Sequence, residues 1–211
     1  MNPQLTQDFH KQFYQSINWR KDLSYRGVPI LKNPLDLFIE QEIIYETQPD
    51  VIIETGTAYG GSALYYADLL EKIGSRNLVI TIDIKNSNYI VQYEALKHPR
   101  ILFLDHGSLD ISTFDRLKTW IGPEQSVMVI LDSDHHKDHV LAELRAYSSF
   151  VTPGCYLIVE DSNTDLVLED YGPGPSDAVN EFLSYTTNFK CDKSREKFGL
   201  TFNSWLKKCE S

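Results

Sequence analysis

Short apolar runs alternate with longer amphipathic stretches along this chain, and each run ends at an acidic or polar residue. Largely apolar runs are typical of parallel strands that are buried on both faces. Five runs have this character: Val51–Ile53, Leu78–Asp83, His98–Ser108, Val127–Asp132 and Cys155–Asp161. Because helical patterns separate these strands, the sequence predicts an α/β fold with a mostly parallel sheet and helices on both faces.

Helical spacing of apolar residues predicts the connecting elements. The expected helices are Pro34–Gln48, one that opens at Ser62, Asp110–Trp120, His136–Phe150 and Ser176–Leu183. We expect Ser176 to cap the last of these helices. The runs Phe189–Asp192 and Leu200–Leu206 predict two closing strands, paired antiparallel at the edge of the sheet.

The first 33 residues differ from the rest because they are polar and rich in aromatic side chains. Residues 8–16 predict an amphipathic helix with Phe9 and Phe13 on one face. This helix either packs on the sheet edge or covers a substrate. We expect residues 1–33 to form an N-terminal segment and residues 34–211 to form one domain, and the exposed aromatics predict a homo-oligomer.

The totals exclude several classes of function. The chain has 211 residues and a net charge of -10, and an acidic protein is poorly suited to binding nucleic acid. No apolar run approaches the roughly 20 residues of a membrane span, and the N-terminus lacks the layout of a signal peptide. The three cysteines, without a CxxC pair, predict free thiols in a reducing compartment, so we expect a cytoplasmic location.

The most informative turn follows the first predicted strand, where Glu54 precedes Gly56 and the pair Gly60-Gly61 leads into a helix at Ser62. Glycines at such a turn allow a ligand to approach the backbone, and the helix start offers free N–H groups. There is no Lys for a triphosphate, and Glu54 would repel a pyrophosphate. An acid suits a cationic ligand such as S-adenosylmethionine, although a plain tight strand–helix connection has the same glycines.

A second group of polar residues follows the fourth and fifth predicted strands. If these strands are neighbours, Asp132, Glu160 and Asp161 meet at one edge of the ligand cleft. Three carboxylates suit Mg²⁺ or Mn²⁺, because hard cations prefer oxygen ligands. Alternatively, His135 and His139 could bind zinc or iron from one face of a helix.

Several motifs occur together and in order: Ile53–Leu64, Leu131–Val140, Val159–Ser162, Gly172–Pro175 and Glu196–Thr201. In this combination the chain resembles the cephalosporin hydroxylase (CmcI-like) family, which is itself similar to the rhamnosyl and macrolide-sugar O-methyltransferases. The resemblance spans roughly residues 25–208. It implies the Rossmann-like fold of class I methyltransferases with a seven-stranded sheet, bound S-adenosylmethionine and a divalent ion, Mg²⁺ or Mn²⁺.

The resemblance also implies roles for individual residues. It implies Asp132, Glu160 and Asp161 as metal ligands and His135 as the general base. Asp83 would bind the ribose, as its spacing after the glycines also suggests. The other implied cofactor-binding residues are Glu54, Gly56, Thr57, Tyr59, Gly60, Ser62, Asp105, Gly107, Ser108 and Asp132. The loop 162–171 has a sequence of its own, so we expect it to select the substrate.

The function expected from these observations is metal-dependent O-methylation of a sugar, glycan or natural product through two adjacent hydroxyls. Two alternatives stay open. One is an oxygenase, which would need two histidines and a carboxylate around iron. The other is a non-catalytic subunit that binds S-adenosylmethionine and assists another enzyme.

Overall fold

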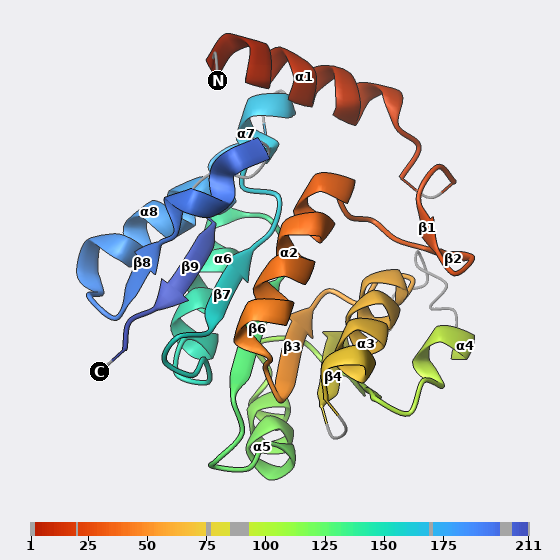
Figure 1. Ribbon diagram of the computed structural model, residues 1–211. Coiled ribbons are helices and arrows are strands. Elements are labelled where there is room, and N and C mark those ends of the chain that lie inside the picture. Colours follow the sequence, from red (N-terminus) through yellow and green to blue (C-terminus); the bar gives the residue numbers. More distant parts are fainter. Residues whose placement is uncertain are drawn as a thin grey trace.

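In the computed structural model, residues 3–19, 21–74, 77–84, 93–168, 171–198 and 204–210 are described. Seven strands form one sheet in the order β5-β4-β3-β6-β7-β9-β8, and the first five are parallel (Figure 1). The strands are β3 (Val51–Thr55), β4 (Leu78–Asp83), β5 (Ile101–Asp105), β6 (Val127–Leu131), β7 (Tyr156–Val159), β8 (Phe189–Cys191) and β9 (Trp205–Lys208). The mostly parallel α/β fold that the sequence predicts is therefore confirmed.

Helices cover both faces of the sheet, because strand residues alternate between two apolar clusters. Ile52 packs with the helices of one face, whereas Val51 and Ile53 pack with those of the other. The first face carries α2 (Pro34–Thr47), α3 (Gly61–Ile73) and α4 (Tyr93–Leu96). The second carries α5 (Ile111–Trp120), α6 (Lys137–Tyr147) and α8 (Pro175–Tyr185).

Four small elements and one long helix lie outside these layers. A hairpin of β1 (Ser24–Tyr25) and β2 (Val28–Pro29) precedes α2, and a 3₁₀ helix η1 (Lys193–Phe198) follows β8. The long helix α1 (Pro3–Ser16) packs on α7 (Thr164–Val167), the short helix after β7 (Figure 1). This contact brings the N-terminal segment to the loop that leaves β7.

The structure differs from the prediction at several boundaries. Helix α8 begins one residue earlier, after Gly174, because Pro175 suits the first helical position; Ser176 therefore lies inside the helix and does not cap it. The two closing strands pair antiparallel, as predicted, but β9 inserts between β7 and β8 and starts at Trp205. The predicted start of that strand, residues 200–203, lies outside the described residues. Helix α1 begins five residues earlier than predicted.

The order of strands creates the crevice that holds the site. The chain leaves β3 for β4 on one side, whereas β6 lies on the other, and ligands bind at such a reversal. Gly56, with φ of +88°, follows β3, and a Cβ there would lie 1.9 Å from the carbonyl oxygen of Asp132. Glycine is therefore needed for close approach of two backbone turns. Gly61 is similar, because its Cβ would lie 2.2 Å from the carbonyl oxygen of Pro29, so chain rather than ligand approaches it.

Two further expectations concern the whole chain. Within the described residues, none of the helices combines the length and the apolar character needed to cross a membrane. Cys155, Cys191 and Cys209 are free thiols, as predicted.

Candidate active site

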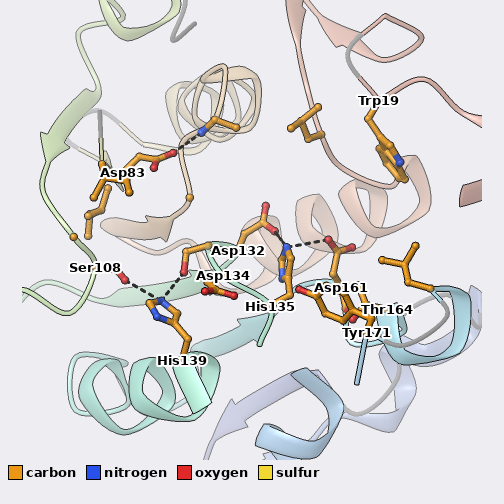
Figure 2. Close-up of a pocket in the computed structure, with 18 of the residues that line it drawn as sticks. Trp19, Asp83, Ser108, Asp132, Asp134, His135, His139, Asp161, Thr164 and Tyr171 are labelled. Carbon is orange, nitrogen blue, oxygen red and sulfur yellow. Dashed lines mark hydrogen bonds and ion pairs between the residues drawn. The ribbon is translucent and has the colours of Figure 1, made fainter. Parts of the chain in front are cut away.

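A cavity of about 730 Å³ opens at the carboxyl ends of β3, β4, β6 and β7 (Figure 2). Many predicted site residues line it: Gly56, Asp83, Gly107, Ser108, Asp132, His135 and Asp161. Residues from α1, from the following loop and from the loop after β7 complete the wall: Tyr14, Trp19, Thr164, Leu168 and Tyr171. The cavity is therefore enclosed by the sheet on one side and by the N-terminal segment on another.

On the side of β4, the carboxylate of Asp83 is fixed by the turn after β3. Its Oδ2 accepts a hydrogen bond from the backbone N–H of Ala58 over 2.9 Å. Burial raises the pKa of Asp83, and backbone N–H groups oppose this shift. An acid held in this way at the end of the second strand of such a sheet suits a ribose diol.

The far end of the cavity is formed by Gly107 and Ser108, which follow β5. His139 of α6 lies between two hydroxyls, with its Nε2 3.4 Å from Ser108 Oγ and 3.1 Å from Ser133 Oγ. Ser133 in turn donates to Glu143 over 2.7 Å. The hydrogen bond with Glu143 raises the pKa of His139. This network ties α6 to the loop after β5 and fixes the shape of that end.

The centre of the site holds two acids and a histidine. Nε2 of His135 lies 3.2 Å from Oδ2 of Asp161 and 3.8 Å from Oδ1 of Asp132 (Figure 2). One ligand atom from each of these three residues falls within 4.8 Å of the others. Two carboxylates and one imidazole fit a divalent ion, so the donor set is compatible with the predicted metal.

The third predicted metal ligand, Glu160, contacts a cation that sequence reasoning missed. Nζ of Lys32 lies 2.9 Å from Asp132 Oδ2 and 3.3 Å from Glu160 Oε1, and the lysine side chain is only 2% exposed. Burial alone would lower the pKa of Lys32, but the charges of Asp132 and Glu160 outweigh burial and hold it well above its usual range. The one sequence signal was a lysine within the apolar stretch that precedes Pro34.

Two more acids lie behind Lys32, away from the cavity. Glu40 of α2 accepts a hydrogen bond from the hydroxyl of Tyr66 over 2.6 Å, and Glu54 of β3 accepts one from Thr81 over 2.6 Å. Both side chains are fully buried, and burial raises the pKa of each. Lys32 is therefore the cation of a buried cluster that contains four acids.

Some predicted cofactor residues lie outside the wall of the cavity. Glu54 belongs to the buried cluster, and Thr57 is buried with its hydroxyl 2.7 Å from that of Thr81. Six predicted residues are absent from the lining that the described part of the chain provides: Glu54, Thr57, Tyr59, Gly60, Ser62 and Asp105. Asp105 ends β5 beside Asp83 but is exposed. Their contacts with the cofactor therefore stay predictions.

The N-terminal segment contributes residues that the sequence pattern did not single out as functional. The hydroxyl of Tyr14 donates to Asp161 Oδ1 over 2.7 Å, and the ring of Trp19 lies 5.0 Å from that of Tyr14. Burial, followed by the charge of Asp161, raises the pKa of Tyr14, so its hydroxyl stays protonated and donates. The only signal was the density of aromatic residues before position 33.

The arrangement of histidines bears on the zinc or iron alternative. His135 faces Asp132 and Asp161, whereas His139 faces Ser108, Ser133 and Glu143. Among the described residues, two groups of acids and histidines have metal-like spacing, and each contains a single histidine. The two-histidine face that an iron oxygenase needs is therefore not formed by His135 and His139.

This strand order, with a cavity at the carboxyl ends of the strands, is the fold of the class I methyltransferases, which the family resemblance implied. The chain belongs to the rhamnosyl O-methyltransferase/CmcI family, whose model matches residues 17–209. The family resemblance seen in the sequence motifs is thus confirmed.

Curated relatives and solved structures agree with this assignment. A rhamnosyl O-methyltransferase of Mycobacterium bovis is 36% identical over 202 residues, which cover 93% of this chain and 81% of the relative. The Mycobacterium leprae protein of the same name is 32% identical, with coverage of 94% and 87%. The apo-structure of CmcI superposes with a TM-score of 0.67 at 21% identity, covering 90% of this chain and 77% of that one.

Proposed function

We propose that this protein transfers the methyl group of S-adenosylmethionine to a hydroxyl of a sugar, with a divalent ion at the acid–histidine centre. The O-methyltransferase class follows from membership of the family. The observation that carries the metal and base roles is the convergence of Asp132, His135 and Asp161 in one cavity. The relatives named rhamnosyl O-methyltransferases support a sugar acceptor, and a solved CmcI structure with Mg and SAM supports Mg²⁺ as the ion.

In this proposal, the half of the cavity beside β3, β4 and β5 binds the cofactor. Asp83 binds the ribose of the cofactor, and Gly107 and Ser108 border its adenine. The turn at Gly56, which the absence of a side chain leaves close to Asp132, would hold the methionine end. The charge of Asp132 then faces the cationic end of the cofactor.

The oxygens of Asp132 and Asp161 would hold the divalent ion. Glu160, which shares the contact with Lys32 with Asp132, is the third predicted ligand. When bound, the ion supplies positive charge that makes an acceptor hydroxyl easier to deprotonate. Nε2 of His135 accepts that proton, and the nearby carboxylates of Asp132 and Asp161 stabilise the imidazolium that forms. The acceptor oxygen bonds to the methyl carbon as the carbon–sulfur bond breaks, which leaves S-adenosylhomocysteine.

The acceptor lies on the side of the N-terminal segment. The aromatic rings of Trp19 and Tyr171 line that wall, and a sugar ring packs well on aromatic faces. We propose that residues 1–33 cover the acceptor while residues 34–211 bind the cofactor and the ion, and that two adjacent hydroxyls of the acceptor face the ion. The exposed side chains of Leu5 and Phe9 on α1 support association into a homo-oligomer.

The test is methyl transfer from labelled S-adenosylmethionine to rhamnosides in the presence of Mg²⁺. We expect a rhamnoside to accept the label and its deoxy analogue, which lacks one of the adjacent hydroxyls, to react at least tenfold more slowly. Asp132→Asn should abolish turnover while S-adenosylhomocysteine still binds. Binding of the cofactor product without transfer to any sugar would instead favour the non-catalytic partner alternative.

A further inference from the structure

A buried ammonium links the two strand ends that carry the acids of the site. Lys32 reaches Asp132, at the end of β6, and Glu160, at the end of β7, from the segment between β2 and α2. We propose that Lys32 is a positioning residue of the transfer site, which fixes the two carboxylates so that a defined set of oxygens faces the divalent ion. This inference rests on the proposed function and deepens it.

The position of the ammonium is fixed from its own side of the chain. Asn33, the next residue, caps α2 by accepting a hydrogen bond from the N–H of Leu35 over 3.0 Å. Two residues before Lys32, the N–H of Ile30 bonds to the carbonyl of Leu23 over 3.2 Å. The backbone on both sides of Lys32 is therefore held, and its side chain enters the interior with 2% exposure. A buried and anchored cation can hold its partners in place before any ligand arrives.

The two oxygens of Asp132 have different partners as a result. Oδ2 contacts Lys32 at 2.9 Å, whereas Oδ1 is turned toward His135, 3.8 Å from Nε2. Lys32 thus decides which oxygen of Asp132 is left for the ion. Groups that orient metal ligands in this way typically change metal affinity by 10–100-fold when they are removed.

Lys32 also neutralises the charge of buried acids, and the experiment must distinguish this effect from the positioning of the two carboxylates. Asp132 and Glu160 are in ion-pair contact with Lys32, while Glu40 and Glu54 complete the buried cluster. Removing a buried cation alone leaves its acids uncompensated, which destabilises the fold. The double variant Lys32→Met/Glu40→Gln removes the cation together with one of the four acids of the cluster, and the amide that replaces the Glu40 carboxyl group still offers an oxygen to the hydroxyl of Tyr66.

The experiment measures Mn²⁺ affinity by isothermal titration calorimetry in the presence of S-adenosylhomocysteine. The electron paramagnetic resonance signal of Mn²⁺ gives a second measure of the bound fraction. We expect Lys32→Met and Lys32→Met/Glu40→Gln each to bind Mn²⁺ at least tenfold more weakly than wild type. Their affinity for S-adenosylhomocysteine alone should stay within threefold. Lys21→Met, at an exposed lysine that precedes β1, should match wild type in both measurements.

The outcomes distinguish this inference from the proposed function. If both Lys32 variants bind Mn²⁺ as tightly as wild type or more tightly, the positioning role of Lys32 is overturned and the proposed metal site stays intact. If only the double variant binds Mn²⁺ with wild-type affinity, Lys32 acts by neutralising buried charge and not by positioning, which also overturns the inference. If Lys32→Met does not fold, the Mn²⁺ affinity of the double variant Lys32→Met/Glu40→Gln is the deciding measurement. Wild-type protein without Mn²⁺ affinity would overturn the proposed metal site itself, and this inference with it.

Discussion

The hydroxyl of Tyr14 in α1 donates a hydrogen bond to Oδ1 of Asp161 after β7, although 147 positions separate the two residues. The other oxygen of Asp161, Oδ2, faces His135 at 3.2 Å. The same loop contributes Asn163, whose amide lies 3.0 Å from the buried ring of His10 on α1. Helix α1, which contributes Tyr14 to the wall of the cavity, is therefore tied to the centre formed by Asp132, His135 and Asp161.

We expect Tyr14→Phe to weaken Mn²⁺ binding by about tenfold, because Asp161 loses the donor that orients it. Loss of the hydrogen bond should also cost about 1 kcal/mol of unfolding free energy. Titration calorimetry measures the Mn²⁺ affinity, and tryptophan emission during urea unfolding, to which Trp19 beside Tyr14 contributes, measures the unfolding free energy. Tyr45→Phe, at an exposed tyrosine of α2, serves as the control. Unchanged Mn²⁺ affinity in Tyr14→Phe would remove Tyr14 from the site and leave it as a packing residue.

Gly56→Ala should destabilise the protein far more than the same change at another glycine of positive φ. At Gly56 the new methyl group would lie 1.9 Å from the carbonyl oxygen of Asp132, in addition to the cost of φ at +88°. Gly27 has φ of +81° and no atom within 4 Å of an added Cβ, so Gly27→Ala carries the conformational cost alone. We expect losses of about 3 kcal/mol at Gly56 and about 1 kcal/mol at Gly27 in urea unfolding.

The comparison of these two glycines also tests the geometry of the site. If Gly56→Ala costs no more than Gly27→Ala, the turns after β3 and β6 are not in close contact. S-adenosylhomocysteine affinity, measured on the same samples, should fall for Gly56→Ala and stay constant for Gly27→Ala.

The part of the site that the sequence predicts well is the part that follows strands. Asp132 and Asp161 come directly after apolar runs, and the carboxyl ends of parallel strands meet at one edge of a sheet, so their convergence was predictable. Lys32 and Tyr14 arrive from an irregular segment and from a separate helix. Their paths are set by tertiary packing, such as the fit of Gly61 against Pro29, which leaves no periodic signal in the sequence. Glu54 is a different case, because it lies within β3 and its buried carboxylate accepts a hydrogen bond from Thr81, so its predicted contact with the cofactor stays a prediction.

The pair of His139 and Glu143 predicts a pH dependence of stability with a definite sign. The pKa of His139 is raised by its hydrogen bond with Glu143, so the protonated form is favoured in the folded state. The stabilisation is complete below the unfolded pKa of about 6.5 and is lost as the pH rises through the higher folded pKa. We expect His139→Gln to cost about 1 kcal/mol at pH 5.5 and clearly less at pH 9.

Urea unfolding of both proteins at the two pH values measures this difference. His136→Gln is the comparison variant, because His136 also pairs with an acid, Asp134, but is largely exposed at the start of α6, where solvent screens the pair. A difference between wild type and His139→Gln that grows with pH would contradict the assigned direction of the shift.

The last prediction separates the two tasks that His135 could perform, since its Nε2 lies near both Asp132 and Asp161. A general base contributes a factor of about 10²–10⁴ to the rate but little to metal binding. We therefore expect His135→Gln to lower kcat by at least a hundredfold while Mn²⁺ and S-adenosylhomocysteine affinities change less than threefold. Asp161→Asn is the reference, because loss of a carboxylate ligand should weaken Mn²⁺ binding by more than tenfold. If His135→Gln loses Mn²⁺ as Asp161→Asn does, the imidazole is a ligand, and the acceptor proton must leave through another group.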